Sequence, residues 1–233
     1  MKSVSAKRLY QYWDDLRGSN PAPERRDIEP AAIKSLLSDI FILEHVSGTD
    51  FSYRLAGSSL CAAYCRELKG RSFGQFWREK DLEAIDTMML AIREDAAAAV
   101  VGFNGVNARG NRAPFEMLLL PLRYGGEDYP RVLGIAVPSD SDYWLGLHPV
   151  EHHEMTSMRL IWPDEQPSFL RHAVNADALL ESDLLGDDPS LQDLVEGDFG
   201  ISVRETNVSE TRANARRQAF RVISGGRAGG SVT

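Results

Sequence analysis

The stretch that decides the fold, residues 41–137, opens with Phe41-Ile-Leu-Glu-His-Val46 and Phe51-Ser-Tyr-Arg-Leu-Ala56. Both runs have the length and the apolar content of short strands. The polar loop Ser47-Gly-Thr-Asp50 between them has the length that closes a hairpin. We therefore expect the stretch to begin with two paired antiparallel strands.

Outward from this hairpin, the pattern changes to helices and then back to strands. Residues 59–68 and 81–97 carry apolar side chains at helical spacing. Longer apolar runs follow at 99–108, 113–123 and 131–137, and turns rich in glycine and asparagine join them. Short turns without a crossover helix favour antiparallel neighbours. Two helices inside an otherwise antiparallel sheet predict an α+β fold.

The N-terminal segment is predicted to be a helical extension, residues 1–38. Residues 5–17 form one helix and residues 29–37 a second, with Pro30 in its first turn. The first helix carries an apolar stripe, which we expect to be the interface of a homodimer. The stripe consists of Leu9, Tyr12, Trp13 and Leu16. The alternative is that the stripe packs on the chain's own sheet.

The C-terminal part, residues 148–233, differs in character from the predicted domain at 39–147. Residues 175–200 are acidic without Lys or Arg, and the sequence from residue 201 is rich in arginine and glycine. Such composition predicts a largely flexible tail. The alternative is that residues 175–200 form short amphipathic helices that dock on a partner or on the chain itself.

Composition narrows the class of protein. The net charge of -8 and the pI near 5.2 argue against a nucleic-acid partner, because neutralising phosphates needs a basic surface. No window has the roughly 20 apolar residues of a spanning helix, and residues 1–10 do not resemble a signal peptide. We therefore expect a cytoplasmic protein without membrane insertion. Cys61 and Cys65, four residues apart on a predicted helix, are expected to be buried, reduced thiols.

Three runs of this sequence together resemble the PAS superfamily. They are Phe51-Ser-Tyr-Arg-Leu-Ala-Gly-Ser-Ser-Leu60, Cys65-Arg-Glu-Leu-Lys-Gly-Arg-Ser-Phe73 and Phe115-Glu-Met-Leu-Leu-Leu-Pro-Leu122. More narrowly, they resemble single-PAS regulators of the bacterial PAS-like family long known only as a domain of unknown function. The resemblance covers about Leu9 to Leu147. It implies a five-stranded antiparallel sheet with helices on one face, a small cavity between them, bacterial signal transduction, and frequent dimerisation through flanking helices.

The cavity implied by the resemblance leads to two functional hypotheses. In the first, the chain is a sensory module that binds a small ligand and signalling proteins. The candidate lining residues are Tyr53, Leu55, Trp77, Met88, Phe103, Met117, Leu119 and Ile135. In the second, the same side chains fill a core, and the protein is a ligand-free interaction scaffold.

Neither flavin nor haem is favoured as a cofactor. The resemblance implies that flavin photochemistry needs a cysteine at a position where this chain has Phe73. Haem needs a His or Met ligand, the helix at 81–97 has no His, and Met88 and Met89 at helical spacing are expected in the core.

His148 and His152 have the i, i+4 spacing of a pair of metal ligands. We favour instead a surface cluster of histidines that includes His153, and we expect no metal.

No enzyme motif is present in the sequence, and we expect a protein without catalytic activity. Glu116 beside Arg54 or Arg131 across the sheet is better explained as an ion pair than as a catalytic pair. Arg217 and Arg221 have the spacing of paired arginines in cyclic di-GMP-binding PilZ domains. The chain ends before such a barrel, which favours a flexible basic tail over a remnant of that site.

Overall fold

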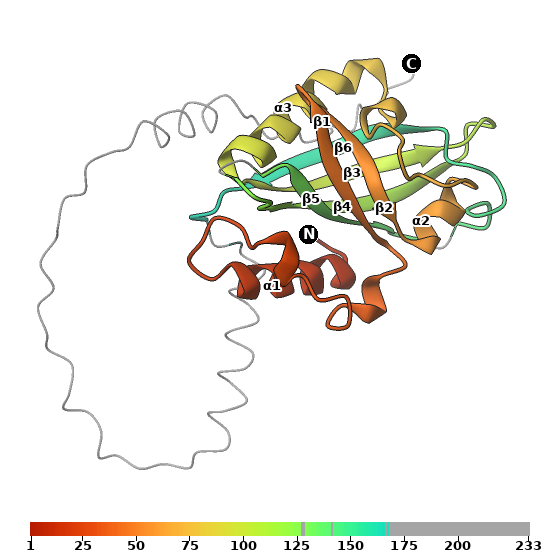
Figure 1. Ribbon diagram of the computed structural model, residues 1–233. Coiled ribbons are helices and arrows are strands. Elements are labelled where there is room, and N and C mark those ends of the chain that lie inside the picture. The colour runs from red at the N-terminus through yellow and green to blue at the C-terminus, as the bar shows by residue number, and fades with distance from the viewer. Residues whose placement is uncertain (127–128, 141, 166, 168–233) are drawn as a thin grey trace, which may run out of the picture. The chain divides into compact units, whose positions relative to one another are not determined.

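The computed structural model describes residues 1–126, 129–140, 142–165 and 167. Its centre is a six-stranded antiparallel sheet with strand order β2-β1-β5-β4-β3-β6 (Figure 1). The strands are β1 (Ile40–Ser47), β2 (Asp50–Ala56), β3 (Ala98–Val106), β4 (Arg112–Leu122), β5 (Arg131–Pro138) and β6 (His152–Ile161). The α-helices are α1 (Val4–Arg17), α2 (Ser58–Ala63) and α3 (Glu79–Asp95). The predicted α+β class is confirmed.

The long helix α3 packs on the face of the sheet formed by β3, β4 and β6. Its first turn is acidic, with Glu79 and Asp81, and its last turn carries Arg93, an arrangement that complements the helix dipole. It ends at Ala96, whose φ of 52° lies in the left-handed region. The side of α3 that faces the sheet is apolar and fully buried, and includes Met88.

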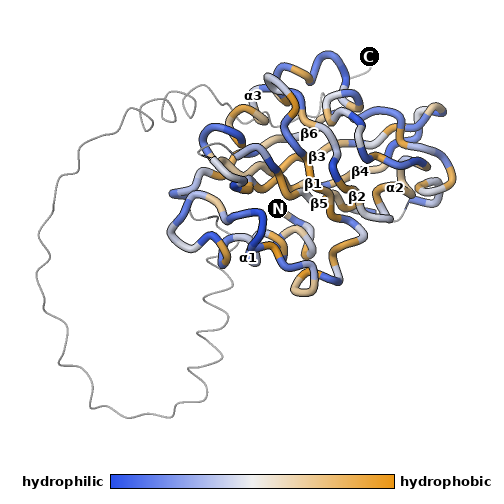
Figure 2. Tube along the Cα trace, viewed as in Figure 1, coloured by the Kyte–Doolittle hydropathy of each residue, from blue (hydrophilic) through white to orange (hydrophobic). Residues whose placement is uncertain are grey.

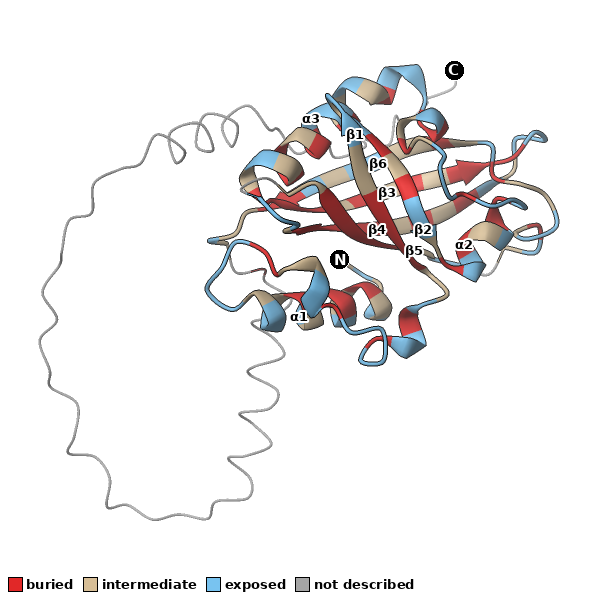
Figure 3. Cartoon of the chain, in the orientation of Figure 1, coloured by how far each residue is buried: buried red, intermediate tan, exposed pale blue. Residues whose placement is uncertain are grey.

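Helix α1 covers the opposite face of the sheet, over β4 and β5 (Figures 1 and 3). The Trp13 indole Nε1 donates a hydrogen bond to the carbonyl of Pro121, 2.8 Å away. The Glu116 carboxylate accepts from the backbone N–H groups of Lys2 and Ser3 at 2.7 and 2.8 Å. Helix α1 belongs to the predicted N-terminal extension, so the sheet is covered by α3 on one face and by this extension on the other. Coverage from both sides explains why residues 117–122 are buried without alternation.

The sixth strand corrects two expectations, the five-stranded sheet and the tail that starts at residue 148. β6 pairs with β3 from Ala98 opposite Ile161 to Val106 opposite His152. Without β6, β3 would be an edge strand with a row of unpaired backbone groups. The remainder of the predicted tail, residues 168–233, lies outside the described residues, together with the proposed helices at 175–200 and the arginine pair Arg217 and Arg221.

The prediction of a second α-helix at 29–37 is wrong, because the segment forms turns and a 3-10 helix. Turns at Glu29–Ile33 lead into a 3-10 helix at Lys34–Leu36. The chain then has to enter β1, and Gly57 packs so closely on the carbonyls of Leu37 and Ser38 that a β-carbon at residue 57 would overlap them. This contact fixes where the segment turns.

Helix α2 is shorter than expected and ends at Ala63, because Cys65 has a φ of 49° in the left-handed region. Cys61 is half-buried and Cys65 is exposed, so the expectation of two buried thiols is wrong, and both thiols are free.

Apolar residues follow the strands, as Figure 2 shows along the centre of the sheet. None of the helices in the described part of the chain has the length and apolar character that crossing a bilayer requires.

Candidate functional site

The most unusual group inside the fold is the imidazole of His153 on β6, which is 0% exposed. Its Nε2 is hydrogen-bonded to the hydroxyl of Tyr64, the residue that caps the C-terminus of α2. Tyr64 is also buried. Two polar side chains from distant parts of the sequence therefore meet inside the core, between α2 and the last strand.

Aromatic rings surround this pair. The Trp77 indole meets the imidazole edge-on at a centroid distance of 4.6 Å, and the Phe103 ring lies 4.4 Å away. The Phe76 ring stacks on the imidazole at 5.8 Å with an interplanar angle of 29°. We call His153, Tyr64, Phe76, Trp77 and Phe103 the His153 cage. Its members come from β6, β3, the end of α2 and the segment that precedes α3.

The cage keeps both polar side chains neutral. Burial, with a smaller contribution from neighbouring His152, lowers the pKa of His153 to about 3. Burial also raises the pKa of Tyr64 well above its usual value of 10. A neutral imidazole has one N–H, and a phenol is the better donor of the two groups. We therefore assign the Tyr64 hydroxyl as the donor to Nε2, which places the proton of His153 on Nδ1.

Two ring nitrogens of the cage, Nδ1 of His153 and Nε1 of Trp77, are buried without a hydrogen-bond partner in the part of the chain that the structure describes. Leaving one buried donor unsatisfied costs about 1–3 kcal/mol. Most buried polar groups in proteins have a partner, so these two nitrogens are the polar groups of the cage that a ligand could contact. The indole N–H of Trp77 is a donor, and an oxygen atom is an acceptor that it could bind.

Polar contacts around the cage hold β6 against the start of α3. The Asp81 carboxylate accepts a hydrogen bond from the backbone N–H of Met155 at 3.2 Å. Glu154 forms ion pairs with Arg78 at 2.7 Å and with Arg112 at 3.0 Å. Because Asp81 lies in the first turn of α3 and Arg78 is its N-cap, these contacts couple the position of β6 to that helix.

The structure places the eight predicted lining residues in different surroundings. Trp77 and Phe103 belong to the cage, and Tyr53 lies beside it, with its ring 6.3 Å from that of Phe76. Four further candidates are fully buried in the core: Met88, Met117, Leu119 and Ile135. None of the eight lines either of two surface hollows, of about 330 and 730 Å³.

Leu55 does not line the interior, because its side chain is 47% exposed. The pairing of β1 with β2 shifts between Tyr53 and Leu55, so that Arg54 forms a bulge. The bulge reverses the alternation of side chains, and Leu55 points out although Phe51 and Tyr53 point in. Simple alternation along the sequence could not show this.

Three cage residues were not among the predicted candidates: Tyr64, Phe76 and His153. His153 was expected in a surface cluster with His148 and His152, and for His153 that expectation is wrong. His152 is part-exposed and accepts a hydrogen bond from Arg78 at 2.9 Å. The missed signal is that His153 stands in a strand, where its neighbour His152 faces the other way.

The predicted dimer interface is partly occupied by the chain itself. Leu9 and Trp13 are buried against the sheet, which is the alternative that the sequence left open. The Tyr12 hydroxyl accepts a hydrogen bond from the backbone N–H of Glu29 at 2.8 Å, and Leu16 is 36% exposed. The four residues therefore do not form one free stripe in this structure.

The expected ion pair across the sheet has a different acidic partner. Glu44, not Glu116, pairs with both Arg54 and Arg131, each at 2.9 Å. These contacts lower the pKa of Glu44 although partial burial opposes them. Within the described ranges, no group of three His, Cys, Asp or Glu side chains is placed to hold a metal ion.

Comparison with known proteins identifies one family. A family model for the PAS domain matches residues 1–137. Among solved structures, the chain is similar to the PAS domain of an HTR-like protein from Haloarcula marismortui, with 20% sequence identity and a TM-score of 0.34. That match covers 57% of this chain and 95% of the other. No curated protein matches the chain.

Proposed function

The chain belongs to the PAS domain family, and on that premise we propose that it is a sensory and regulatory module whose His153 cage binds a small ligand. The proposal places the protein in cytoplasmic signal transduction in a bacterium, with signalling proteins as partners and without catalytic activity of its own. Binding in the cage would change the population of states that such partners recognise.

One observation carries the proposal, the pair of buried ring nitrogens, Nε1 of Trp77 and Nδ1 of His153, that have no hydrogen-bond partner among the described residues. Every other face of the cage is aromatic, so the ligand that fits is small and largely apolar, with an oxygen that accepts hydrogen bonds. The rings around His153 already lie at centroid distances of 4.4 to 5.8 Å. At these distances the rings are in contact, so a ligand would have to separate them, which disfavours a molecule as large as a flavin or a haem.

The contacts around the cage supply a route from ligand to partner. Trp77 precedes the N-cap of α3, and His153 lies on the strand that Asp81 and Arg78 hold to that helix. A ligand that separates the two rings has to move β6 relative to the start of α3. The surface formed by these two elements would then differ between the free and the bound states.

The alternative is a ligand-free interaction scaffold. Tight packing supports it, because seven of the eight candidate lining residues are buried and in the core. In that case the unpartnered nitrogens would only lower the stability of the folded state, and an exposed surface would carry the function. Leu16 of α1 and Leu55 of β2 are exposed apolar residues that a homodimer or another partner would cover.

Native mass spectrometry of the protein purified from its own host distinguishes the two functions. The native mass is compared with the denatured mass, and an absorption spectrum is recorded on the same sample. A small additional mass on wild type that is lost in His153→Phe supports the sensor. A bare mass in both proteins supports the scaffold, and a doubled bare mass identifies it as a homodimer.

A further inference from the structure

A second candidate site lies far from the cage in sequence, at the turn between β4 and β5. A surface hollow of about 730 Å³ separates this turn from the segment that follows α1. It is lined by Glu24, Arg25, Arg26, Arg123, Tyr124, Gly125 and Gly126. We call these residues the arginine hollow.

Backbone hydrogen bonds fix the two walls of the hollow. The N–H of Arg25 donates to the carbonyl of Arg123, and the N–H of Arg123 donates to the carbonyl of Pro23, both at 2.9 Å. Glu24 and Arg123 form a parallel backbone bridge. The arginines are therefore presented by a short extension of the sheet rather than by a free loop.

The charge of the lining residues is positive. Glu24 is the one acidic residue among the lining residues that the structure describes, and it forms a long ion pair with Arg123 at 3.5 Å. Arg26 is 87% exposed and lies 3.9 Å from Asp27. Arg25 makes no ion pair within the described ranges, and its Nε is buried without a partner. The Arg25 guanidinium is thus available to an anion, and that of Arg26 is held only by a long ion pair with Asp27. Guanidinium is the group that best matches phosphate oxygens.

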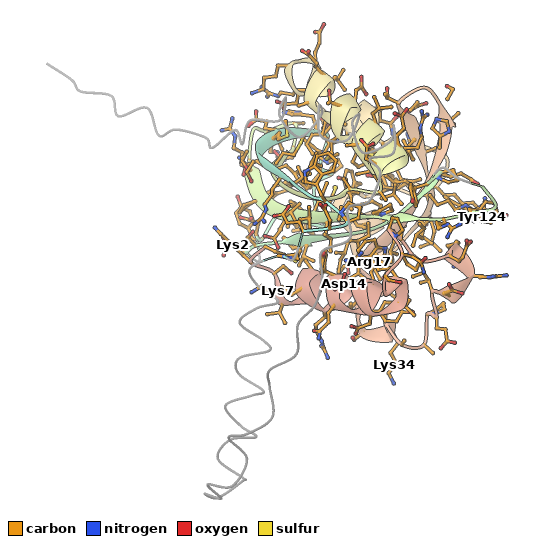
Figure 4. The ribbon with its side chains drawn as sticks, turned by 90° about the vertical axis from the view of Figure 1, so that its left-hand side faces the viewer. Lys2, Lys7, Asp14, Arg17, Lys34 and Tyr124 are labelled. Atoms are coloured by element: carbon orange, nitrogen blue, oxygen red, sulfur yellow. The ribbon has the colours of Figure 1, made fainter. Side chains whose placement is uncertain are left out.

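Tyr124 adds a flat aromatic surface beside these charges. The guanidinium of Arg131 lies 3.7 Å from the ring centroid, and Glu44 holds that guanidinium in place. The ring is nevertheless 55% exposed, and Figure 4 shows it at the tip of its turn. Gly125 and Gly126 follow, and a β-carbon built on either would have no atom within 4 Å. Among the described residues, the two glycines therefore place no side chain beside Tyr124, and the exposed part of its ring is where a planar ring would stack.

We propose that the arginine hollow binds a phosphate-bearing ligand with a planar ring, of which a mononucleotide is the simplest example. The phosphate group lies against Arg25 and Arg26, and the ring stacks on Tyr124. This site is separate from the His153 cage, and it does not depend on the function proposed for the cage.

Calorimetric titration of the full chain tests the site with three probes: adenosine monophosphate, guanosine monophosphate and inorganic phosphate. Wild type should show saturable binding of the nucleotides. The double variant Arg25→Ala/Arg26→Ala should lose at least about tenfold in affinity for all three probes. Tyr124→Ala should weaken the nucleotides alone, and Tyr124→Phe should restore their binding because the ring is kept.

Arg109→Ala is the matched control, since Arg109 is an exposed arginine in the turn before β4, at the opposite end of that strand. It removes a positive charge without touching the hollow, and nucleotide affinity should stay within about twofold of wild type. Two results would overturn the proposal. One is the absence of saturable binding of any probe up to roughly millimolar concentration. The other is an equal loss of affinity in the control, which would show a general charge effect.

Discussion

The indole of Trp77 meets the imidazole of His153 at a centroid distance of 4.6 Å and an angle of 79°, and the backbones of the two residues form an isolated bridge. Through this contact, the segment before α3 is packed directly on the last strand of the sheet. Both side chains are buried, so neither ring can move alone. A change at either ring is therefore transmitted to the other element.

The first prediction concerns acid stability. The pKa of His153 is lowered in the folded protein to about 3 from a usual value of 6.5. Below pH 6.5 the unfolded chain binds a proton that the folded chain does not, so stability falls as the pH falls. The expected slope approaches about 1.4 kcal/mol per pH unit. Urea unfolding at several values between about pH 5 and 6.5 measures it.

His153→Phe is the control for this slope, because it removes the titrating group and keeps a ring. The variant should lose most of the slope, whatever its stability at neutral pH. Glu44 and Glu154, whose pKa values are lowered from 4.5, act only at lower pH. An unchanged slope in the variant would show that another group titrates.

The second prediction concerns the hydrogen bond between Tyr64 and His153. Tyr64→Phe and His153→Phe each leave one buried polar group without its partner, so each should destabilise the protein. The double variant leaves neither group, and it should be more stable than the sum of the single changes predicts. We expect a coupling energy of about 1–2 kcal/mol in a double-mutant cycle from urea unfolding. Additive effects would mean that the two groups do not interact in solution.

The third prediction concerns the centre of the sheet. The ring of Phe41 on β1 lies directly on Gly134 of β5, where a β-carbon would overlap it. Gly134→Ala should therefore lower the free energy of unfolding by about 1–3 kcal/mol. Gly126→Ala, where a β-carbon meets open space, should stay within about 0.5 kcal/mol of wild type. Equal effects of both changes on thermal unfolding would contradict the packing described.

The fourth prediction concerns α1. Trp13→Ala removes a buried indole and its hydrogen bond to Pro121, and should cost about 3–5 kcal/mol. Leu16→Ala, one turn further on and exposed, should cost less than about 1 kcal/mol. Chemical unfolding of both variants tests whether the helix packs on its own sheet. A small loss for Trp13→Ala would instead place its side chain outside the core.

Much of the fold could be predicted from the sequence, because its first five strands carry a clear apolar pattern. The expected strand at 113–123 is β4 (Arg112–Leu122), and the expected helix at 81–97 is α3 (Glu79–Asp95). In each case the apolar spacing agrees with the burial that the structure shows. In these elements the local apolar pattern and the tertiary packing favour the same secondary structure.

The remaining features depend on pairing between distant residues. β6 was missed because Thr156 forms a bulge opposite β3, between the pairs of Met155 and Ser157, which breaks the alternation that marks a strand. Leu55 was misplaced for the same reason, through the bulge at Arg54. The burial of His153 follows from β6, so the centre of the candidate site could not be found without the sixth strand.

The most direct test of the ligand site uses the ring N–H groups themselves. Nitrogen-15 NMR spectra of the protein from its own host are recorded as purified and again after unfolding, dialysis and refolding. Spectra of Trp77→Phe and His153→Phe assign the two signals. We predict that both N–H signals shift after the treatment, because the ligand oxygen that accepts from them has been removed. Identical signals before and after the treatment would contradict the proposal that the cage binds a ligand.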